Sequence, residues 1–142
     1  MAPFAAVVLL ISAISGLLAA TKEPAYSSEK PLYAFVVLNE EATKVLKLVL
    51  DESRGTGNGY DTIHADLNLN GDLTDDRAVK GTMRKSERTI ACSFPAINVP
   101  VPYKEKGRGV DKPWEIRISY VQFDNPAGID RRCSLDAKCS DS

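Results

Sequence analysis

Trp114-Glu-Ile-Arg-Ile-Ser-Tyr120 is the stretch that decides the fold class of this 142-residue chain. Large apolar side chains occupy every second position, and charged or hydroxyl side chains fill the positions between them. Successive side chains of a β-strand point to opposite faces of the sheet, so this alternation predicts a strand with one buried and one exposed face. Such a strand needs neighbours to pair with and a second layer to cover its apolar face.

Shorter runs of similar character occur before this stretch. We expect strands at 32–38, 44–50, 60–65, 77–83 and 89–94, then an extended path through 95–103 whose prolines suit a sheet edge. The competing interpretation of the second run is a helix with Asn39 as its N-cap, whose apolar face is formed by Ala42, Val45, Leu46 and Val49. Many short strands and frequent turn residues predict an all-β fold, either a small antiparallel sandwich or a barrel.

The two ends of the chain differ from this domain. Residues 1–20 carry no charged side chain and contain an apolar run at 7–14. They resemble a secretory signal peptide cleaved near Ala20, which predicts export to the periplasm, cell surface or medium, without stable membrane insertion afterwards. A membrane anchor is the alternative, because the length is at the lower limit for crossing a bilayer. We expect a linker at 21–30, a β-rich domain at 31–125 and a poorly ordered tail at 126–142, which also fits a fragment of a longer protein.

The main functional signal is the stretch Asp66-Leu-Asn-Leu-Asn-Gly-Asp-Leu-Thr-Asp-Asp76. Oxygen-bearing side chains alternate with apolar ones before a glycine and an acidic end. A calcium ion takes about six to eight oxygen ligands, and a loop surrounds it by offering carboxylates and amides at every second position. The pattern predicts one bound Ca²⁺, with these candidate ligands: Asp66, Asn68, Asn70, Asp72, Asp75 and Asp76.

This stretch resembles the calcium loop of EF-hand proteins, and more closely the dockerin-type loop of secreted bacterial proteins. The resemblance covers residues 66–77, while the chain as a whole resembles secreted β-rich bacterial proteins that carry a similar segment. It implies ligation by the side chains of Asp66, Asn68 and Asn70, by the backbone carbonyl of Asp72 and by a water on Thr74. The apolar Leu73 is then expected to pack into the domain. We carry over the ligand chemistry without the helix-loop-helix fold, because 60–65 is expected to be a strand.

The loop departs from the EF-hand pattern at two positions. Leu69 is a bulky apolar residue where those loops usually avoid one, and Arg77 stands in place of the bidentate carboxylate. Asp75 or Asp76 would then close the shell in a tighter loop. An ordinary turn is the alternative, because Asn, Gly and Asp tolerate turn conformations. With two or three carboxylates, we expect a weak site with a Kd on the order of 10⁻⁴ to 10⁻³ M.

Charge is balanced overall and uneven along the chain. The net charge of −1 argues against nucleic acid as a partner. Residues 39–76 hold nine acids and three bases, whereas residues 77–117 hold ten bases and four acids. The basic half, together with the aromatic residues Tyr103, Trp114 and Tyr120, suggests a surface for anionic polysaccharide as an alternative function. On its alternating strand, Trp114 is more typical of a core residue than of a sugar platform.

Cysteine and histidine give weaker signals. In an exported protein Cys133 and Cys139 could close a small disulfide loop that leaves Cys92 buried or free, and unpaired thiols are the alternative. His64 is the single histidine and no nucleophile motif accompanies it, so we expect it to face solvent from a strand. The glycine-rich 53–59 lacks phosphate-loop spacing and is interpreted as a hairpin connection.

These observations favour a secreted, non-enzymatic, β-rich domain with one structural Ca²⁺. Carboxylate pairs such as Asp75 with Asp76 are present, but glycosidase chemistry needs two carboxylates held across a cleft. The alternatives are the polysaccharide-binding surface and an accessory domain of a secreted enzyme. No protein partner follows from the sequence.

Overall fold

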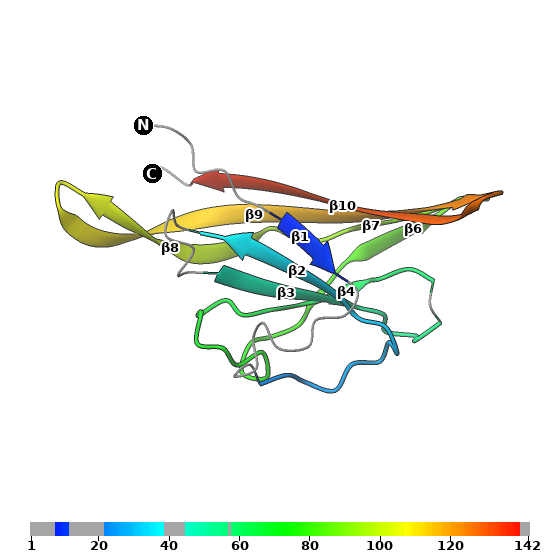
Figure 1. Cartoon of the computed structure of the whole chain (residues 1–142), viewed down its shortest axis with the longest axis horizontal. Coiled ribbons are helices and arrows are strands. Elements are labelled where there is room, and N and C mark those ends of the chain that lie inside the picture. The colour runs from blue at the N-terminus through cyan, green and yellow to red at the C-terminus, as the bar shows by residue number, and fades with distance from the viewer. Residues whose placement is uncertain (1–7, 12–21, 39–44, 57, 140–142) are drawn as a thin grey trace.

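The computed structural model describes residues 8–11, 22–38, 45–56 and 58–139 (Figure 1). These residues form an all-β fold without a helix, which confirms the expected fold class. The strands in chain order are β1 (Val8–Ile11), β2 (Leu32–Val37), β3 (Val45–Asp51), β4 (Thr62–Ala65), β5 (Val79–Lys80), β6 (Thr82–Lys85), β7 (Thr89–Ser93), β8 (Ile97–Glu105), β9 (Arg108–Asn125) and β10 (Gly128–Cys139).

Two five-stranded antiparallel sheets form a small sandwich. The first sheet has the order β1-β2-β3-β4-β5, and the second has the order β10-β9-β7-β6 with β8 also paired to β9. β9 is the central strand of the second sheet: β10 pairs with residues 114–125 on one edge, whereas β7 and β8 lie end to end along the other. Most of the expected signal peptide, residues 1–7 and 12–20, lies outside the described residues, and Val8–Ile11 pairs with β2.

The core lies between the two sheets. Leu46, Leu48 and Leu50 of β3 point inward from the first sheet, and all three are fully buried. The second sheet contributes every second residue of β9, as the alternation of 114–120 predicted: Ile116, Ile118 and Tyr120 are buried and Trp114 packs partly buried against them. The rings of Tyr60 and Tyr120 meet edge to face across the sandwich, with centroids 5.2 Å apart.

Two expected elements differ from the structure in the middle of the chain. The strand predicted at 77–83 is divided at Gly81, where the chain leaves β5 of the first sheet and enters β6 of the second. The helix considered for residues 39–49 is absent over 45–49, which belong to β3, and its start at 39–44 lies outside the described residues.

The expectation of a poorly ordered tail at 126–142 is wrong for residues 128–139. After a two-residue turn at Pro126 and Ala127, β10 pairs with β9 without interruption from Gly128 to Cys139. The inward side chains Leu135 and Ala137 pack against the core. Residues 140–142 lie outside the described part of the chain.

The disulfide considered between Cys133 and Cys139 is not formed. Both residues lie on β10, and six residues of extended strand separate their Cα atoms by roughly 20 Å. A disulfide requires Cα atoms within about 7 Å. Cys133 is therefore a free, half-buried thiol, and Cys92 is a second free thiol whose burial raises its pKa to about 11.

Gly81 is required by close packing at the crossover between the sheets. A Cβ atom at this position would stand 2.4 Å from Sγ of Cys92 and 2.9 Å from the ring of Phe94. We expect Gly81→Ala to lower the free energy of unfolding by about 1–3 kcal/mol, as overpacking of a core does. Gly109→Ala, where a Cβ would meet nothing within 4 Å, is the matched control. Equal urea midpoints for the two variants would contradict this account of the crossover.

Candidate metal loop and the segment that holds it

The acidic loop begins directly after β4, on a residue held by the first sheet. Asp66 is 5% exposed, and its N–H donates to the carbonyl of Lys47 in β3 at 3.1 Å. Its carboxylate turns into the loop: Oδ1 accepts the N–H of Asn70 at 3.1 Å, and Oδ2 accepts the N–H of Gly71 at 2.9 Å. One rigid carboxylate thus sets the curvature of the loop.

The following polar side chains continue this pattern at every second residue. Oδ1 of Asn68 accepts the N–H of Asn70, Oδ1 of Asn70 accepts the N–H of Asp72, and Oδ1 of Asp72 accepts the N–H of Thr74. Each contact is an Asx turn, in which a side-chain oxygen bonds the backbone two residues ahead. Successive turns of this kind keep the side-chain oxygens close to the loop backbone.

The two acidic residues at the end of the loop return to its beginning. Oδ2 of Asp75 accepts the side-chain amides of Asn68 and Asn70, at 3.3 and 2.6 Å. Oδ2 of Asp76 accepts the N–H of Leu67 at 3.1 Å. Burial raises the pKa of Asp76, and the nearby charges of Asp75 and Asp66 raise it further, although the Leu67 N–H acts in the opposite direction. The carboxylate of Asp76 is therefore close enough to those of Asp75 and Asp66 to be repelled by both.

Two residues with positive φ allow the chain to turn this tightly. Gly71 has φ 81°, which glycine adopts at little cost. Leu69, the residue that departs from the EF-hand pattern, has φ 58°. The left-handed region is unfavourable for a side chain with a Cβ, so the contacts of Asp66 hold Leu69 there against its own preference.

The expected linker at 21–30 is instead part of the fold, because residues 22–30 cross the first sheet. Lys22 pairs in parallel with the loop: its N–H donates to the carbonyl of Gly71 at 2.9 Å, and its carbonyl accepts the N–H of Leu73 at 2.8 Å. Its ammonium lies 3.6 Å from Oδ2 of Asp72. Leu73 is 1% exposed, which confirms the expectation that it packs into the domain. The loop and the N-terminal segment are one unit.

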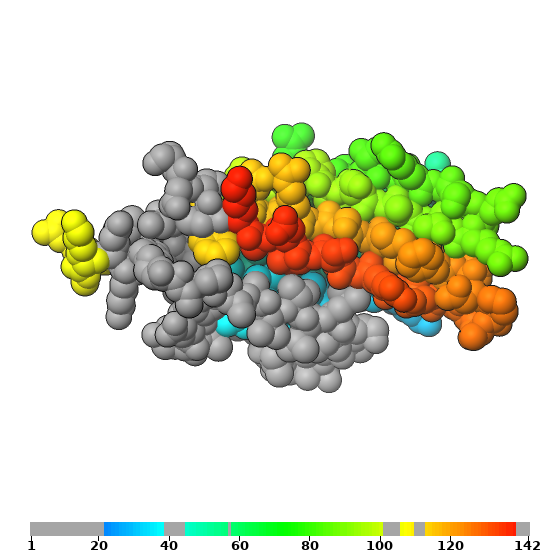
Figure 2. All heavy atoms as spheres, turned by 90° about the horizontal axis from the view of Figure 1, so that it is seen from above, coloured from blue at the N-terminus to red at the C-terminus, as the bar shows by residue number. Residues whose placement is uncertain are grey.

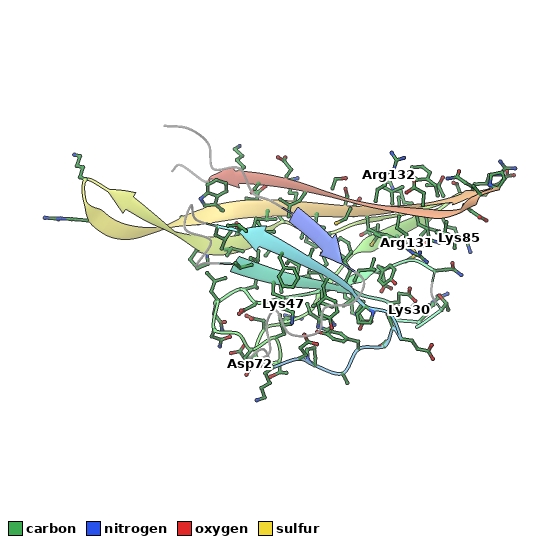
Figure 3. The ribbon with its side chains drawn as sticks, viewed as in Figure 1. Lys30, Lys47, Asp72, Lys85, Arg131 and Arg132 are labelled. Atoms are coloured by element: carbon green, nitrogen blue, oxygen red, sulfur yellow. The ribbon has the colours of Figure 1, made fainter. Side chains whose placement is uncertain are left out.

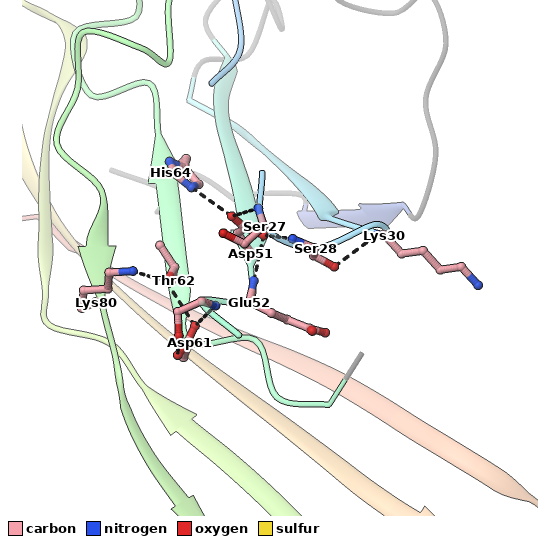
Figure 4. A network of polar contacts seen from close by, with 10 residues as sticks. Ser27, Ser28, Lys30, Asp51, Glu52, Asp61, Thr62, His64 and Lys80 are labelled. Carbon is pink, nitrogen blue, oxygen red and sulfur yellow. Dashed lines mark hydrogen bonds and ion pairs between the residues drawn. The ribbon is translucent and has the colours of Figure 1, made fainter. Parts of the chain in front are cut away.

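Asp51 fastens the far end of the same segment (Figure 4). Its two carboxylate oxygens accept the N–H groups of Ser27 and Ser28 at 2.9 and 2.8 Å, and the N–H of Glu52 at 2.8 Å. Asp51 is 4% exposed. A buried carboxylate that accepts three backbone N–H groups is well compensated for the loss of water.

Between these two ends, a polar cluster lies under the segment. Nζ of Lys47, a residue only 5% exposed, bonds to Oε1 of Glu23. Oη of Tyr33 donates to the other oxygen of Glu23 at 3.0 Å, and burial together with this carboxylate raises the pKa of Tyr33 to about 12. Figure 3 shows Lys47 and Asp72 on the side of the molecule away from β9 and β10.

His64 belongs to this covered face, so the expectation that it faces solvent is wrong. Its side chain is 14% exposed, its Nε2 lies 3.5 Å from Oδ2 of Asp51, and its ring meets that of Tyr26 edge to face at 5.4 Å. Sequence inspection missed this cluster, although β3 carries a signal for it. Lys47, Val49 and Asp51 share the second face of β3. An apolar residue between two charged ones on that face is expected for a strand covered on both sides.

The aromatic residues considered for a polysaccharide surface do not form one in the described residues. Tyr120 is fully buried, and Trp114 is partly buried against the core. The side chain of Tyr103 lies outside the described residues. A sugar platform needs an exposed ring face, which Tyr120 cannot offer.

The donor set of the loop suits a hard cation, with Asn oxygens as part of the shell. Among the described residues, no three His, Cys, Asp or Glu side chains are grouped tightly enough to hold a metal by themselves. The loop offers carboxylates from Asp66, Asp75 and Asp76 and amide oxygens from Asn68 and Asn70, and calcium accepts both kinds of oxygen. Asp75 and Asp76 would exchange their present N–H donors for the ion.

Comparison with protein-family models, with curated proteins and with solved structures finds no match to this chain. The residues that the structure describes contain no helix long and apolar enough to cross a membrane.

The role of Asp51 can be tested by its removal. Asp51→Ala leaves the N–H groups of Ser27, Ser28 and Glu52 without their acceptor, so we expect a loss of about 3 kcal/mol in the free energy of unfolding. Amide exchange at Ser27 and Ser28 should accelerate. The exposed Asp124→Ala is the control, with little change expected. Unchanged protection of Ser27 and Ser28 in Asp51→Ala would show that other contacts hold the segment.

Proposed function

We propose that this chain is an exported, non-enzymatic β-sandwich domain that binds one structural Ca²⁺ in the loop at 66–76. The observation that carries the proposal is the return of Asp75 to the amide groups of Asn68 and Asn70, beside Asp66 and Asp76. A simple turn needs no such gathering of like charges. A divalent cation would relieve their repulsion and use the free lone pairs of the Asn oxygens.

The cation would stabilise more than the loop. Gly71 and Leu73 hold Lys22, and the segment that follows Lys22 covers the polar cluster on the first sheet. Free energy of binding to the folded state therefore adds to the stability of the segment and the sheet. At a calcium concentration tenfold above Kd, this contribution is about 1.4 kcal/mol. Calcium outside the cytoplasm is abundant enough to fill a weak site, which agrees with the proposed export.

The polar residues under the segment favour a structural role over a catalytic one. Asp51 and His64 contact each other beneath Tyr26. Asp61, the other carboxylate near the start of β4, accepts the N–H of Ser53 at 2.8 Å in the connection from β3. These groups hold chain segments together, and a general acid or base needs instead to reach a bound substrate.

The test is calcium titration of metal-free protein by calorimetry, with thermal melting in calcium and in chelator. We expect a single weak site and a rise in Tm of roughly 4 °C at ten times Kd. The double variant Asp75→Asn with Asp76→Asn keeps the size of both side chains and removes two charges. It should fold, melt near the Tm of the metal-free parent and lose the calcium response.

Asp124→Asn is the matched control, because this exposed residue at the end of β9 lies outside the loop. It should respond to calcium as the parent does. No heat of binding and no change of Tm at roughly 10 mM calcium, ten times the weakest expected Kd, would reject the proposal and leave the loop as a hydrogen-bonded turn. A response that survives in the double variant would place the ion elsewhere.

A further inference from the structure

β10 offers a long open edge of backbone hydrogen-bonding groups. It pairs with β9 from Gly128 to Cys139 without a bulge, and no other strand among the described residues pairs with it. Figure 2 shows its residues, coloured orange to red, at the surface along the sheet. A long, regular edge strand is a template for pairing with another chain, and proteins usually block such edges.

The other edges of this sheet carry blocking features that β10 lacks. β8 contains Pro100 and Pro102, which have no N–H to donate. β6 is four residues long and carries Arg84 and Lys85, so a second copy would meet like charges there. β10 has no proline, and four of its five charged residues alternate in sign along the strand: Asp130, Arg132, Asp136 and Lys138.

These four charges lie on one face of β10, and Arg131 lies on the other. Leu135 is opposite the buried Ile118, so the odd-numbered residues of β10 face the core and the even-numbered residues face outward. The outward series from the N-terminal end is Asp130, Arg132, Ser134, Asp136 and Lys138. Residues at equal distances from Ser134 carry opposite charges: Arg132 and Asp136 are two residues away, and Asp130 and Lys138 are four residues away.

We propose that β10 pairs with β10 of a second copy of this chain, antiparallel and centred on Ser134, to form a two-fold symmetric dimer. In this register Arg132 lies opposite Asp136 of the second copy, and Asp130 lies opposite Lys138 of the second copy. The two-fold axis repeats both pairs. Opposite charges directly across an antiparallel pair stabilise it, and like charges destabilise it.

The charge pattern selects this register over its neighbours. Centring the pair on Cys133 places Asp130 opposite Asp136 of the second copy. Centring it on Leu135 places Arg132 opposite Lys138 of the second copy. Both shifts bring like charges together, so complementarity is specific to the register centred on Ser134.

Contacts within the chain extend this complementarity. Within one copy, Asp136 of β10 lies opposite Arg117 of the neighbouring strand β9. In the dimer, Asp136 therefore lies between two arginines, Arg117 of its own copy and Arg132 of the other. On the inner face, half-buried Cys133 meets Leu135 of the second copy, so pairing covers apolar surface that the single copy leaves partly exposed.

The axis is perpendicular to the sheet, because antiparallel partners point their side chains to the same face. The two β9-containing sheets then join into one continuous sheet, and each copy keeps its own first sheet on the inner side. No apolar outer surface is needed for this association, in agreement with the polar outward face of β10.

Cross-linking of the full chain tests the register. Ser134→Cys places two thiols directly opposite each other, with Cβ atoms about 5 Å apart, so oxidation should give a disulfide-linked dimer. Ser93→Cys is the control: it is exposed on the same face but lies on β7, away from the β10 edge. We expect a cross-linked dimer from Ser134→Cys and none from Ser93→Cys or the parent.

A charge exchange tests the partner contacts by sedimentation equilibrium over roughly 10 µM to 1 mM protein. Asp136→Arg should raise the dimer dissociation constant at least about tenfold, because a like-charge contact is made twice across the axis. Adding Arg132→Asp to this variant restores opposite charges and should recover most of the affinity.

Three outcomes would overturn the proposal: a parent that stays monomeric over this range, a dimer that Asp136→Arg leaves intact, or a folded double variant that does not regain affinity. Failure of Ser134→Cys to cross-link in a dimeric sample would place the interface on another surface. Calcium binding is independent of these results, because the loop lies on the first sheet.

Discussion

Backbone pairing along β9 is the constraint on which the rest of the structure depends. This strand bonds β10 on one edge and both β7 and β8 on the other, so it sets the position of these three strands, and β6 is placed through β7. Its inward residues Ile116, Ile118 and Tyr120 form one half of the core. The first sheet must supply the other half with the leucines of β3, and this requirement leaves the second face of β3 to be covered by residues 22–30.

The covering of β3 by residues 22–30 explains why the acidic loop and the N-terminal segment form one unit. Lys22 pairs with the loop at one end, and Asp51 holds Ser27 and Ser28 at the other. Lys47, which lies between them and bonds to Glu23, is shielded from water by the same segment. A ligand of the loop would therefore act on the stability of the sheet through backbone hydrogen bonds, without any rearrangement of the core.

Local patterns predicted the elements whose character does not depend on distant residues. The alternation of 114–120, the apolar runs that became β2 and β3, and the burial of Leu73 all agree with the structure. β10 was missed because its inward positions include Arg131 and the small Ala137, so its own periodicity is weak. Pairing with β9 makes it a strand. His64 was misplaced because the segment that covers it is thirty-odd residues away in the chain.

The sequence by itself determined the all-β class, the inward face of β9 and the alternation of oxygen-bearing residues at 66–76, because each follows from the period of two along an extended chain. Only the tertiary structure decided that residues 22–30 cover the first sheet and that Asp75 and Asp76 return to Asn68 and the start of the loop. It also decided that, among the described residues, no strand other than β9 pairs with β10. These outcomes depend on contacts between segments far apart in the chain, and no local pattern encodes which segments will meet.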